Sequence, residues 1–158
     1  MPGSGKSRVA KKLANMLCIP FQDSDIYIEE KEGKRIHEIF SEKGEQYFRD
    51  MEWTWVNNPH PAGVYATGGG LPCHNHAVDV LLHKGTVVYL QASEVVLKQR
   101  ISQNSSRPMF SGLEENEVLD FLKNLLKQRK QYYQKANFCI NVEGKNEEDI
   151  VKEIISLI

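Results

Sequence analysis

Apolar positions recur at two spacings along the chain, in short continuous runs and in longer stretches with a period of three or four. The short runs are rich in β-branched and aromatic residues and predict strands at 19–22, 64–67, 86–90 and 138–142. The periodic stretches predict helices at 8–17, 26–32, 36–56, 76–84, 93–103, 116–135 and 147–158. Strands that alternate with helices and are nearly continuously apolar indicate an α/β fold, with a parallel sheet covered by helices on both faces.

Glycines and polar runs mark the boundaries between these elements. Ser24 can act as the N-cap of the 26–32 helix. Gly33 and Gly85 follow predicted helices, and Gly44 is expected to divide the long 36–56 region into two helices. The segment from about 104 to 116 begins without periodicity and is predicted to be a surface loop. No repeat or low-complexity tract appears, and 158 residues are enough for one domain, which we place at 1–158.

The first seven residues read as the second half of a phosphate-binding loop. Gly5-Lys6-Ser7 matches the end of the pattern G-x-x-x-x-G-K-[ST], and a predicted helix follows directly, as the motif requires. Small residues at Gly3, Ser4 and Gly5 let backbone N–H groups approach a triphosphate. Lys6 then supplies a charge for the β- and γ-phosphates, and the Ser7 hydroxyl can ligate Mg²⁺. The alternative is a glycine-rich turn before an ordinary helix.

Composition and charge favour a small-molecule partner. The chain is 41% hydrophobic and 26% charged, which is ordinary for a globular protein, and its net charge of −1 gives no electrostatic footprint for nucleic acid or an anionic membrane. No signal peptide or membrane span is visible in the sequence. Three widely spaced cysteines fit free thiols in a reducing cytoplasm. The run Cys73–His76 lacks a second ligand pair at zinc spacing, so we assign it no metal.

Further chemical residues follow the predicted strands. Asp23 and Asp25 come after the first of them, where one carboxylate can orient the water shell of Mg²⁺ and the other can accept a proton from an attacking hydroxyl. The alternative is that both are turn and helix-capping residues. Gly68–Gly70 follows the second strand and offers backbone N–H groups to an anion or hydroxyl. Arg49 and Glu52 can pair on one helix face, and Arg107 has the position of a lid arginine.

With these residues in place, the chain resembles the shikimate kinases over nearly its whole length. The matching segments, in the order of the family, are Gly3–Ser7, Asp23–Asp25, Ile39–Phe40, Gly44–Glu45, Phe48–Arg49, Glu52, Thr67–Gly70, Arg100, Arg107–Pro108, Arg129 and Tyr132–Tyr133. The resemblance implies a nucleoside-monophosphate-kinase type of fold with strand order 2-3-1-4-5. It also implies transfer of the ATP γ-phosphate to the 3-hydroxyl of shikimate.

The resemblance further implies a role for each matching site residue. The residues expected to bind ATP are Gly3, Ser4, Gly5, Lys6, Ser7, Arg8, Arg100 and Arg107, with Arg100 against adenine. Ser7 would ligate Mg²⁺, and Asp23 would support the ion through water. Asp25 would be the base, acting with Lys6 and Arg107. Arg49 and Arg129 would hold the carboxylate of shikimate, and Gly69 and Gly70 its ring hydroxyls. Planar guanidinium groups suit a carboxylate, and backbone amides suit hydroxyls.

The chain departs from the family pattern at three places. Arg8 stands where the family usually has a hydroxyl residue, and 143–146 lacks a proline common in the adenine loop. The first strand, which lies in the middle of the sheet in this fold, has no counterpart before Met1. We therefore expect Met1 to be an internal methionine of a longer working protein. The alternative is a true start, in a chain that pairs its outer strands differently.

Two other functions stay open on the sequence alone. The first is another small-metabolite kinase of the same fold, such as a gluconate kinase or a nucleoside monophosphate kinase. The second is a regulatory nucleotide-binding module without turnover, although such a module has no need of Asp25 or Arg107. We expect a monomer that binds shikimate and ATP.

Overall fold

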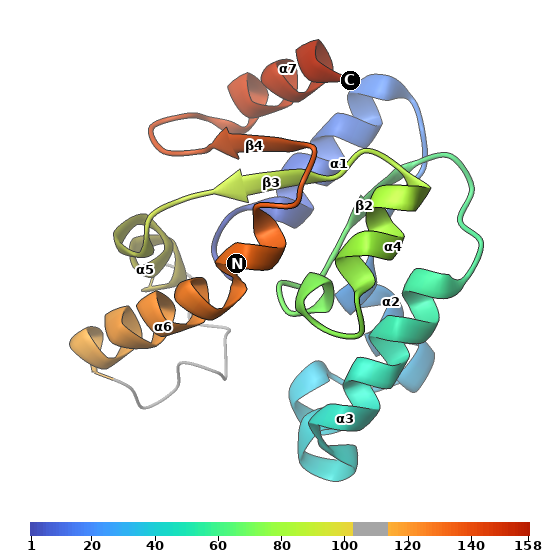
Figure 1. Cartoon of the computed structure of the whole chain (residues 1–158), viewed down its shortest axis with the longest axis vertical. Helices are drawn as coiled ribbons and strands as arrows, with labels where there is room; N and C mark the ends of the chain where they lie inside the picture. Colours follow the sequence, from blue (N-terminus) through green and yellow to red (C-terminus); the bar gives the residue numbers. More distant parts are fainter. Residues whose placement is uncertain (103–113) are drawn as a thin grey trace.

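The computed structural model describes residues 1–102 and 114–158. The four strands are β1 (Phe21–Asp23), β2 (Val64–Ala66), β3 (Val88–Gln91) and β4 (Phe138–Asn141). The helices are α1 (Lys6–Leu17), α2 (Ser24–Glu32), α3 (Ile36–Asn57), the 3₁₀ helix η1 (Leu71–Cys73), α4 (Ala77–Lys84), α5 (Glu94–Ser102), α6 (Glu115–Tyr133) and α7 (Glu147–Leu157). All the strands and helices expected from the sequence are present, with bounds shifted by a few residues (Figure 1).

The strands form two parallel pairs. Strand β1 pairs with β2, with Phe21 opposite Val64, and β3 pairs with β4, with Val88 opposite Phe138. Within the described residues no ladder joins β2 to β3, so the expected single sheet is divided into two. The two pairs match the outer pairs, 2-3 and 4-5, of the expected strand order 2-3-1-4-5.

Helices pack around both strand pairs. Helix α1 contacts β1 and β2 as well as α7, while α4 packs against α3 and η1, and α5 packs against α6 (Figure 1). The amino terminus lies between the two strand pairs, close to the end of α6. The phosphate-binding segment is therefore in the middle of the molecule.

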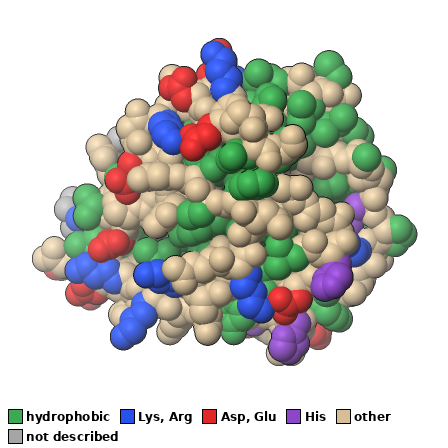
Figure 2. Space-filling view, turned by 45° about the horizontal axis from the view of Figure 1, so that its top comes forward, with side chains coloured by type: hydrophobic (Ala, Val, Ile, Leu, Met, Phe, Trp, Pro, Cys, Tyr) green, Lys and Arg blue, Asp and Glu red, His purple; other side chains and the backbone are tan. Residues whose placement is uncertain are grey.

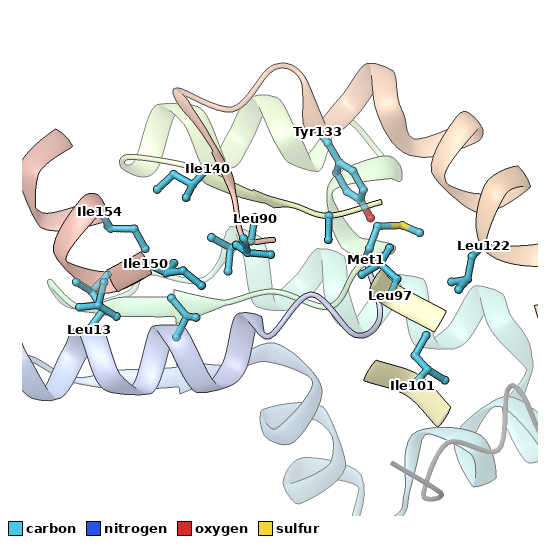
Figure 3. Close-up of a cluster of buried hydrophobic side chains, with 14 residues drawn as sticks. Met1, Leu13, Leu90, Leu97, Ile101, Leu122, Tyr133, Ile140, Ile150 and Ile154 are labelled. Atoms are coloured by element: carbon cyan, nitrogen blue, oxygen red, sulfur yellow. The ribbon is translucent and has the colours of Figure 1, made fainter. Parts of the chain in front are cut away.

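The main hydrophobic core joins the second strand pair to α1, α5, α6 and α7. Leu90 and Ile140 of the two strands lie among Leu13, Leu97 and Ile154 (Figure 3). The first strand pair is packed by smaller clusters around Trp55 of α3 and around Ile28 and Phe48.

Two local features fix the carboxyl end of β1. Asp23 is the N-cap of α2, because its Oδ1 accepts a hydrogen bond of 2.9 Å from the Asp25 amide; the sequence had suggested Ser24 for this position. The buried Ser24 hydroxyl instead accepts a hydrogen bond of 2.8 Å from the Gly68 amide. This bond ties the start of α2 to the turn that follows β2.

Helix α3 bends at Gly44, where φ is 81° and ψ is 168°. The predicted break therefore occurs at the expected residue, as a kink inside one continuous helical segment. A left-handed φ of this size is readily adopted only by glycine. None of the helices in 1–102 and 114–158 is both long and apolar enough to cross a membrane.

Candidate active site

The phosphate-binding segment has the backbone that its glycines predict. Gly3 and Gly5 have φ values of 79° and 85°, and Gly5 is the residue immediately before α1. A Cβ on Gly3 would also lie only 3.0 Å from the Leu97 carbonyl oxygen, so the position requires glycine for two reasons. Lys6 begins α1, and its Nζ donates a hydrogen bond of 2.8 Å to the Met1 carbonyl.

Ser7 and Asp23 lie together at the carboxyl end of β1. The Ser7 hydroxyl donates a hydrogen bond of 2.5 Å to Asp23 Oδ2, and the Asp23 side chain is buried. Mg²⁺ prefers such oxygen ligands and usually keeps several waters and substrate phosphates beside one or two protein groups. These two oxygens fit that pattern. In the described part of the chain, no group of three or more His, Cys, Asp or Glu side chains could hold a metal. Cys73, His74 and His76 lie in this part and form no such group.

Asp25 carries the features of a proton acceptor. Its Oδ1 is buried and has no hydrogen-bond partner. Burial raises the pKa of the Asp25 carboxyl, the nearby Asp23 charge raises it further, and Lys6 opposes the shift. A carboxylate with a raised pKa and a vacant oxygen can take a proton from a hydroxyl placed beside it.

Arg49 is held between two acidic residues on α3. Its Nη1 donates a bond of 2.7 Å to Glu52, and its Nη2 donates one of 2.8 Å to Glu45. The Arg49 and Glu52 side chains are only 12% and 3% exposed, so their ion pair is buried. Burial outweighs the Arg49 charge and raises the pKa of Glu52 to about 7.

The triple-glycine turn receives both arginines expected to hold a carboxylate. A Cβ on Gly70 would lie 2.6 Å from Arg49 Nη1, and a Cβ on Gly69 would lie 3.2 Å from Arg129 Nη1. The two guanidinium groups therefore lie against consecutive residues of one turn. Side chains on Gly69 or Gly70 would displace them.

Helix α6 brings Arg129 to this turn and anchors it there with Tyr133. The Tyr133 hydroxyl donates a hydrogen bond of 2.7 Å to the Gly69 carbonyl. Burial raises the pKa of Tyr133 to about 12, so the phenol stays protonated and remains a donor. Its ring stacks on Tyr89 with centroids 4.8 Å apart, which links the turn to β3.

Two residues expected to bind ATP, Arg100 and Arg8, lie on the side of β4 and α7. Arg100 Nη2 donates a hydrogen bond of 3.1 Å to the Val142 carbonyl, just before the 143–146 segment. The Arg8 side chain is 80% exposed and pairs with Glu147 at 2.7 Å. Arg107 and most of the predicted lid, 104–116, lie outside the described residues. The last part of the lid range is described and contains the start of α6.

Two site features could not be read from the sequence. The burial of Glu52 depends on α3 packing beside Gly68, and neither its spacing from Arg49 nor its match to the family pattern predicts that burial. The bond from Tyr133 to Gly69 joins residues 64 positions apart, and a tyrosine pair at the end of a helix carries no signal for such a contact.

The chain matches the family model described as shikimate kinase over residues 2–158. The chain belongs to the shikimate kinase family. A relative named shikimate kinase from Sulfurihydrogenibium sp. is 37% identical, over 99% of this chain and 92% of its own length. Another, from Thermodesulfovibrio yellowstonii, is 37% identical over 97% of this chain and 88% of its own length.

Solved structures of the family have the same fold. The shikimate kinase of Acinetobacter baumannii in complex with shikimate aligns with a TM-score of 0.90 and 34% identity, over 99% of this chain and 88% of that one. The Bacteroides thetaiotaomicron enzyme aligns with a TM-score of 0.89 and 32% identity, over 98% of this chain and 92% of that one. The α/β phosphate-binding-loop kinase fold expected from the sequence is thereby confirmed.

Proposed function

We propose that this protein transfers the γ-phosphate of ATP to the 3-hydroxyl of shikimate, giving shikimate 3-phosphate and ADP. The observation that carries the proposal is the convergence of two arginines and one carboxylate on a single turn. Arg129 and Arg49 lie against Gly69 and Gly70, and Asp25 Oδ1 lies against Gly68. This arrangement can grip a small carboxylate and present one of its hydroxyls to a base.

The carboxylate of shikimate is held by Arg49 and Arg129. Glu45 and Glu52 fix the Arg49 guanidinium from two sides, which orders it before the substrate arrives. An ordered guanidinium loses little entropy on binding, and its fork matches a carboxylate with two parallel bonds. Gly69 and Gly70 contribute backbone groups to the ring hydroxyls.

In the reaction the 3-hydroxyl oxygen forms a bond to the γ-phosphorus while the bond from that phosphorus to the β,γ-bridging oxygen breaks. Asp25 accepts the hydroxyl proton, and ADP leaves with the bridging oxygen. Lys6 stabilises the negative charge on the transferring group. Backbone N–H groups of Gly3, Ser4 and Gly5 hold the phosphates, and Arg8 and Arg100 are assigned to the nucleotide, with Arg100 against the base.

Ser7 and Asp23 are the residues that would hold Mg²⁺ beside these phosphates, Ser7 directly and Asp23 through water. Bound there, the ion would neutralise phosphate charge and align the β- and γ-oxygens. The short bond between Ser7 and Asp23 supports this assignment, because it places two oxygens together at the start of α1.

We also propose that the enzyme acts as a monomer. We place it in the cytoplasm, because its three cysteines are all free, as is usual in a reducing compartment. Its partners are shikimate and ATP, with neither nucleic acid nor membrane.

ADP release with ATP and Mg²⁺ tests the proposal against its rivals. Shikimate, gluconate and a set of nucleoside monophosphates are supplied separately, and only shikimate should support turnover. Turnover on gluconate or on a nucleoside monophosphate would identify a different kinase of this fold. Nucleotide binding without ADP release on any acceptor would favour a regulatory module.

A further inference from the structure

A half-buried histidine, His74, lies just beyond the triple-glycine turn. Figure 2 shows histidine side chains on the surface of one face of the molecule, close to both acidic and basic side chains. His37 and His76 are exposed, whereas His74 is partly covered. Within residues 1–102 and 114–158, neither nitrogen of the His74 ring has a hydrogen-bond partner. A partly buried imidazole with both nitrogens unpaired is available to a ligand.

The backbone holds His74 close to Gly70. The Cys73 amide donates a hydrogen bond of 2.9 Å to the Gly70 carbonyl, so η1 closes a tight turn on the glycine against which Arg49 lies. His74 is the C-cap of η1, and its own carbonyl accepts a hydrogen bond of 2.8 Å from the Ala77 amide at the start of α4. The chain is therefore anchored on both sides of His74.

The two residues after His74 have an unusual backbone. Asn75 and His76 have φ values of 48° and 56°, in a region that residues other than glycine rarely adopt. Such conformations persist where the surrounding structure fixes them, and they are frequent beside ligand sites. Here they let α4 begin at Ala77 while η1 packs against α3 and α6 as well as α4.

The charges around the His74 ring come from the proposed carboxylate site. Burial lowers the pKa of His74, Arg49 lowers it further, Glu45 opposes the shift, and Arg129 lowers the pKa again. Arg49 and Glu45 belong to α3, and Arg129 belongs to α6. No shift comes from the titratable residues of α4, which are Asp79, His83 and Lys84. The imidazole therefore lies beside both guanidinium groups and is mainly neutral at pH 7.

We propose that His74 is a third recognition group for the carboxylate of the substrate and binds it as an imidazolium, after taking up a proton from the solvent. This inference rests on the proposed function. An anion between Arg49 and Arg129 offsets the charges that keep the imidazole neutral and places its own negative charge near the ring. The ring then donates a charge-assisted hydrogen bond to the carboxylate.

Binding of the carboxylate should depend on pH in a defined direction. The pKa of His74 lies below its ordinary value in the free protein, and the bound carboxylate raises it. Between these two values only the complex binds the proton. The affinity for shikimate is therefore greatest at low pH and falls as the pH rises through the pKa of His74 in the complex.

His74→Asn removes the ionisable ring and keeps a polar side chain. Its KM for shikimate should be about five- to tenfold above that of the wild-type protein at pH 6 and within about twofold at pH 8.5, with little change in kcat. Asp25 and Glu52 are present in both proteins, so the difference between the two pH profiles belongs to His74. His37→Asn, at an exposed position of α3, is the control and should keep the wild-type KM at both pH values. Equal KM values for His74→Asn and the wild-type protein at pH 6 would overturn the proposal.

The methyl ester of shikimate separates recognition of the carboxylate from a structural role of His74. The ester has no charge for an imidazolium to meet, so its KM at pH 6 should be the same for His74→Asn and the wild-type protein. A KM difference as large on the ester as on the acid would overturn the proposal in favour of a structural role. Absence of turnover by the wild-type protein on shikimate would overturn the proposed function and this inference together, whereas equal KM values with normal turnover overturn the inference alone.

Discussion

Asp25 and Glu52 direct their unpaired carboxyl oxygens at the same glycine. A Cβ on Gly68 would lie 2.4 Å from Asp25 Oδ1 and 2.9 Å from Glu52 Oε1, and both oxygens are buried without a hydrogen-bond partner. Two carboxyl groups this close cannot both ionise without strong repulsion. Burial raises the pKa of both, and the Asp25 charge raises the pKa of Glu52 further. The absence of a side chain at residue 68 is what allows them to share this space.

The first prediction concerns that glycine. Gly68→Ala should push the two carboxyl groups apart and lower kcat/KM by about tenfold or more, since a shift near 1 Å in a catalytic group is costly. Gly85→Ala is the control, because no atom lies within 4 Å of a Cβ there and the backbone is extended. Steady-state kinetics on both variants decides the matter, and a Gly68→Ala enzyme with normal kcat/KM would contradict the geometry.

The second prediction separates the two roles of Arg49, substrate binding and compensation of Glu52. Arg49→Met should raise the KM for shikimate and also lower the free energy of unfolding by about 2–3 kcal/mol. This loss of stability is smaller than that expected on breaking most buried ion pairs, because Glu52, with a pKa of about 7, can take up a proton when Arg49 is removed.

The double variant Arg49→Met/Glu52→Gln should recover most of that stability, measured by denaturant unfolding, while its KM stays raised. If KM returned to normal with stability, Arg49 would have a structural role only. Arg129→Met should raise KM as well, whereas Lys130→Met, at the exposed next position of α6, should not.

The third prediction concerns pH. Because the pKa of Glu52 rises from 4.5 in the unfolded chain to about 7 in the folded protein, the folded state binds more protons between these values. Its contribution to stability is therefore complete below about pH 4.5 and is lost as the pH rises through 7, by up to about 3 kcal/mol. The pKa of Asp25 is raised as well, so its titration adds to the loss of stability as the pH rises.

Glu52→Gln removes this titration. Melting temperatures at pH 5 and pH 8 should therefore differ less in the variant than in the wild-type protein. Parallel changes in the two proteins would show that Glu52 is already ionised in the folded state at pH 5.

These contacts show which parts of the site the sequence could predict. The phosphate-binding loop, Asp23, Asp25 and the triple glycine lie next to one another because each ends a strand or begins a helix, and parallel strands end at one edge. The local signals at Gly5, Gly44 and Gly85 likewise marked helix ends and the kink correctly. Such features depend on residues that are close in the sequence, so the local sequence pattern is enough to predict them.

Contacts between distant segments could not be predicted in the same way. The burial of Glu52 and the bond from Tyr133 to Gly69 depend on how α3 and α6 pack, and the sequence pattern gives no register for that packing. The N-cap of α2 was placed one residue late, because Ser and Asp are both good capping residues and Ser24 is used by Gly68 instead.

The fourth prediction assigns the base. Asp25→Asn should lower kcat by about 10²–10⁴-fold, the range for loss of a general base, with little change in the KM for ATP. Asp50→Asn, on an exposed position of α3, is the control. A loss smaller than about tenfold would mean that Asp25 only positions the hydroxyl and that the transfer needs little help from a base.

The most direct test of the proposed reaction is the identity of its product. Shikimate, ATP and Mg²⁺ are incubated with the wild-type protein and with Lys6→Met, and the product is analysed by ³¹P–¹H correlation NMR. We expect one new phosphate ester coupled to the proton on carbon 3 of shikimate in the wild-type reaction, and none with Lys6→Met. Phosphate on another hydroxyl, or an unchanged shikimate spectrum with the wild-type protein, would contradict the assignment of this site.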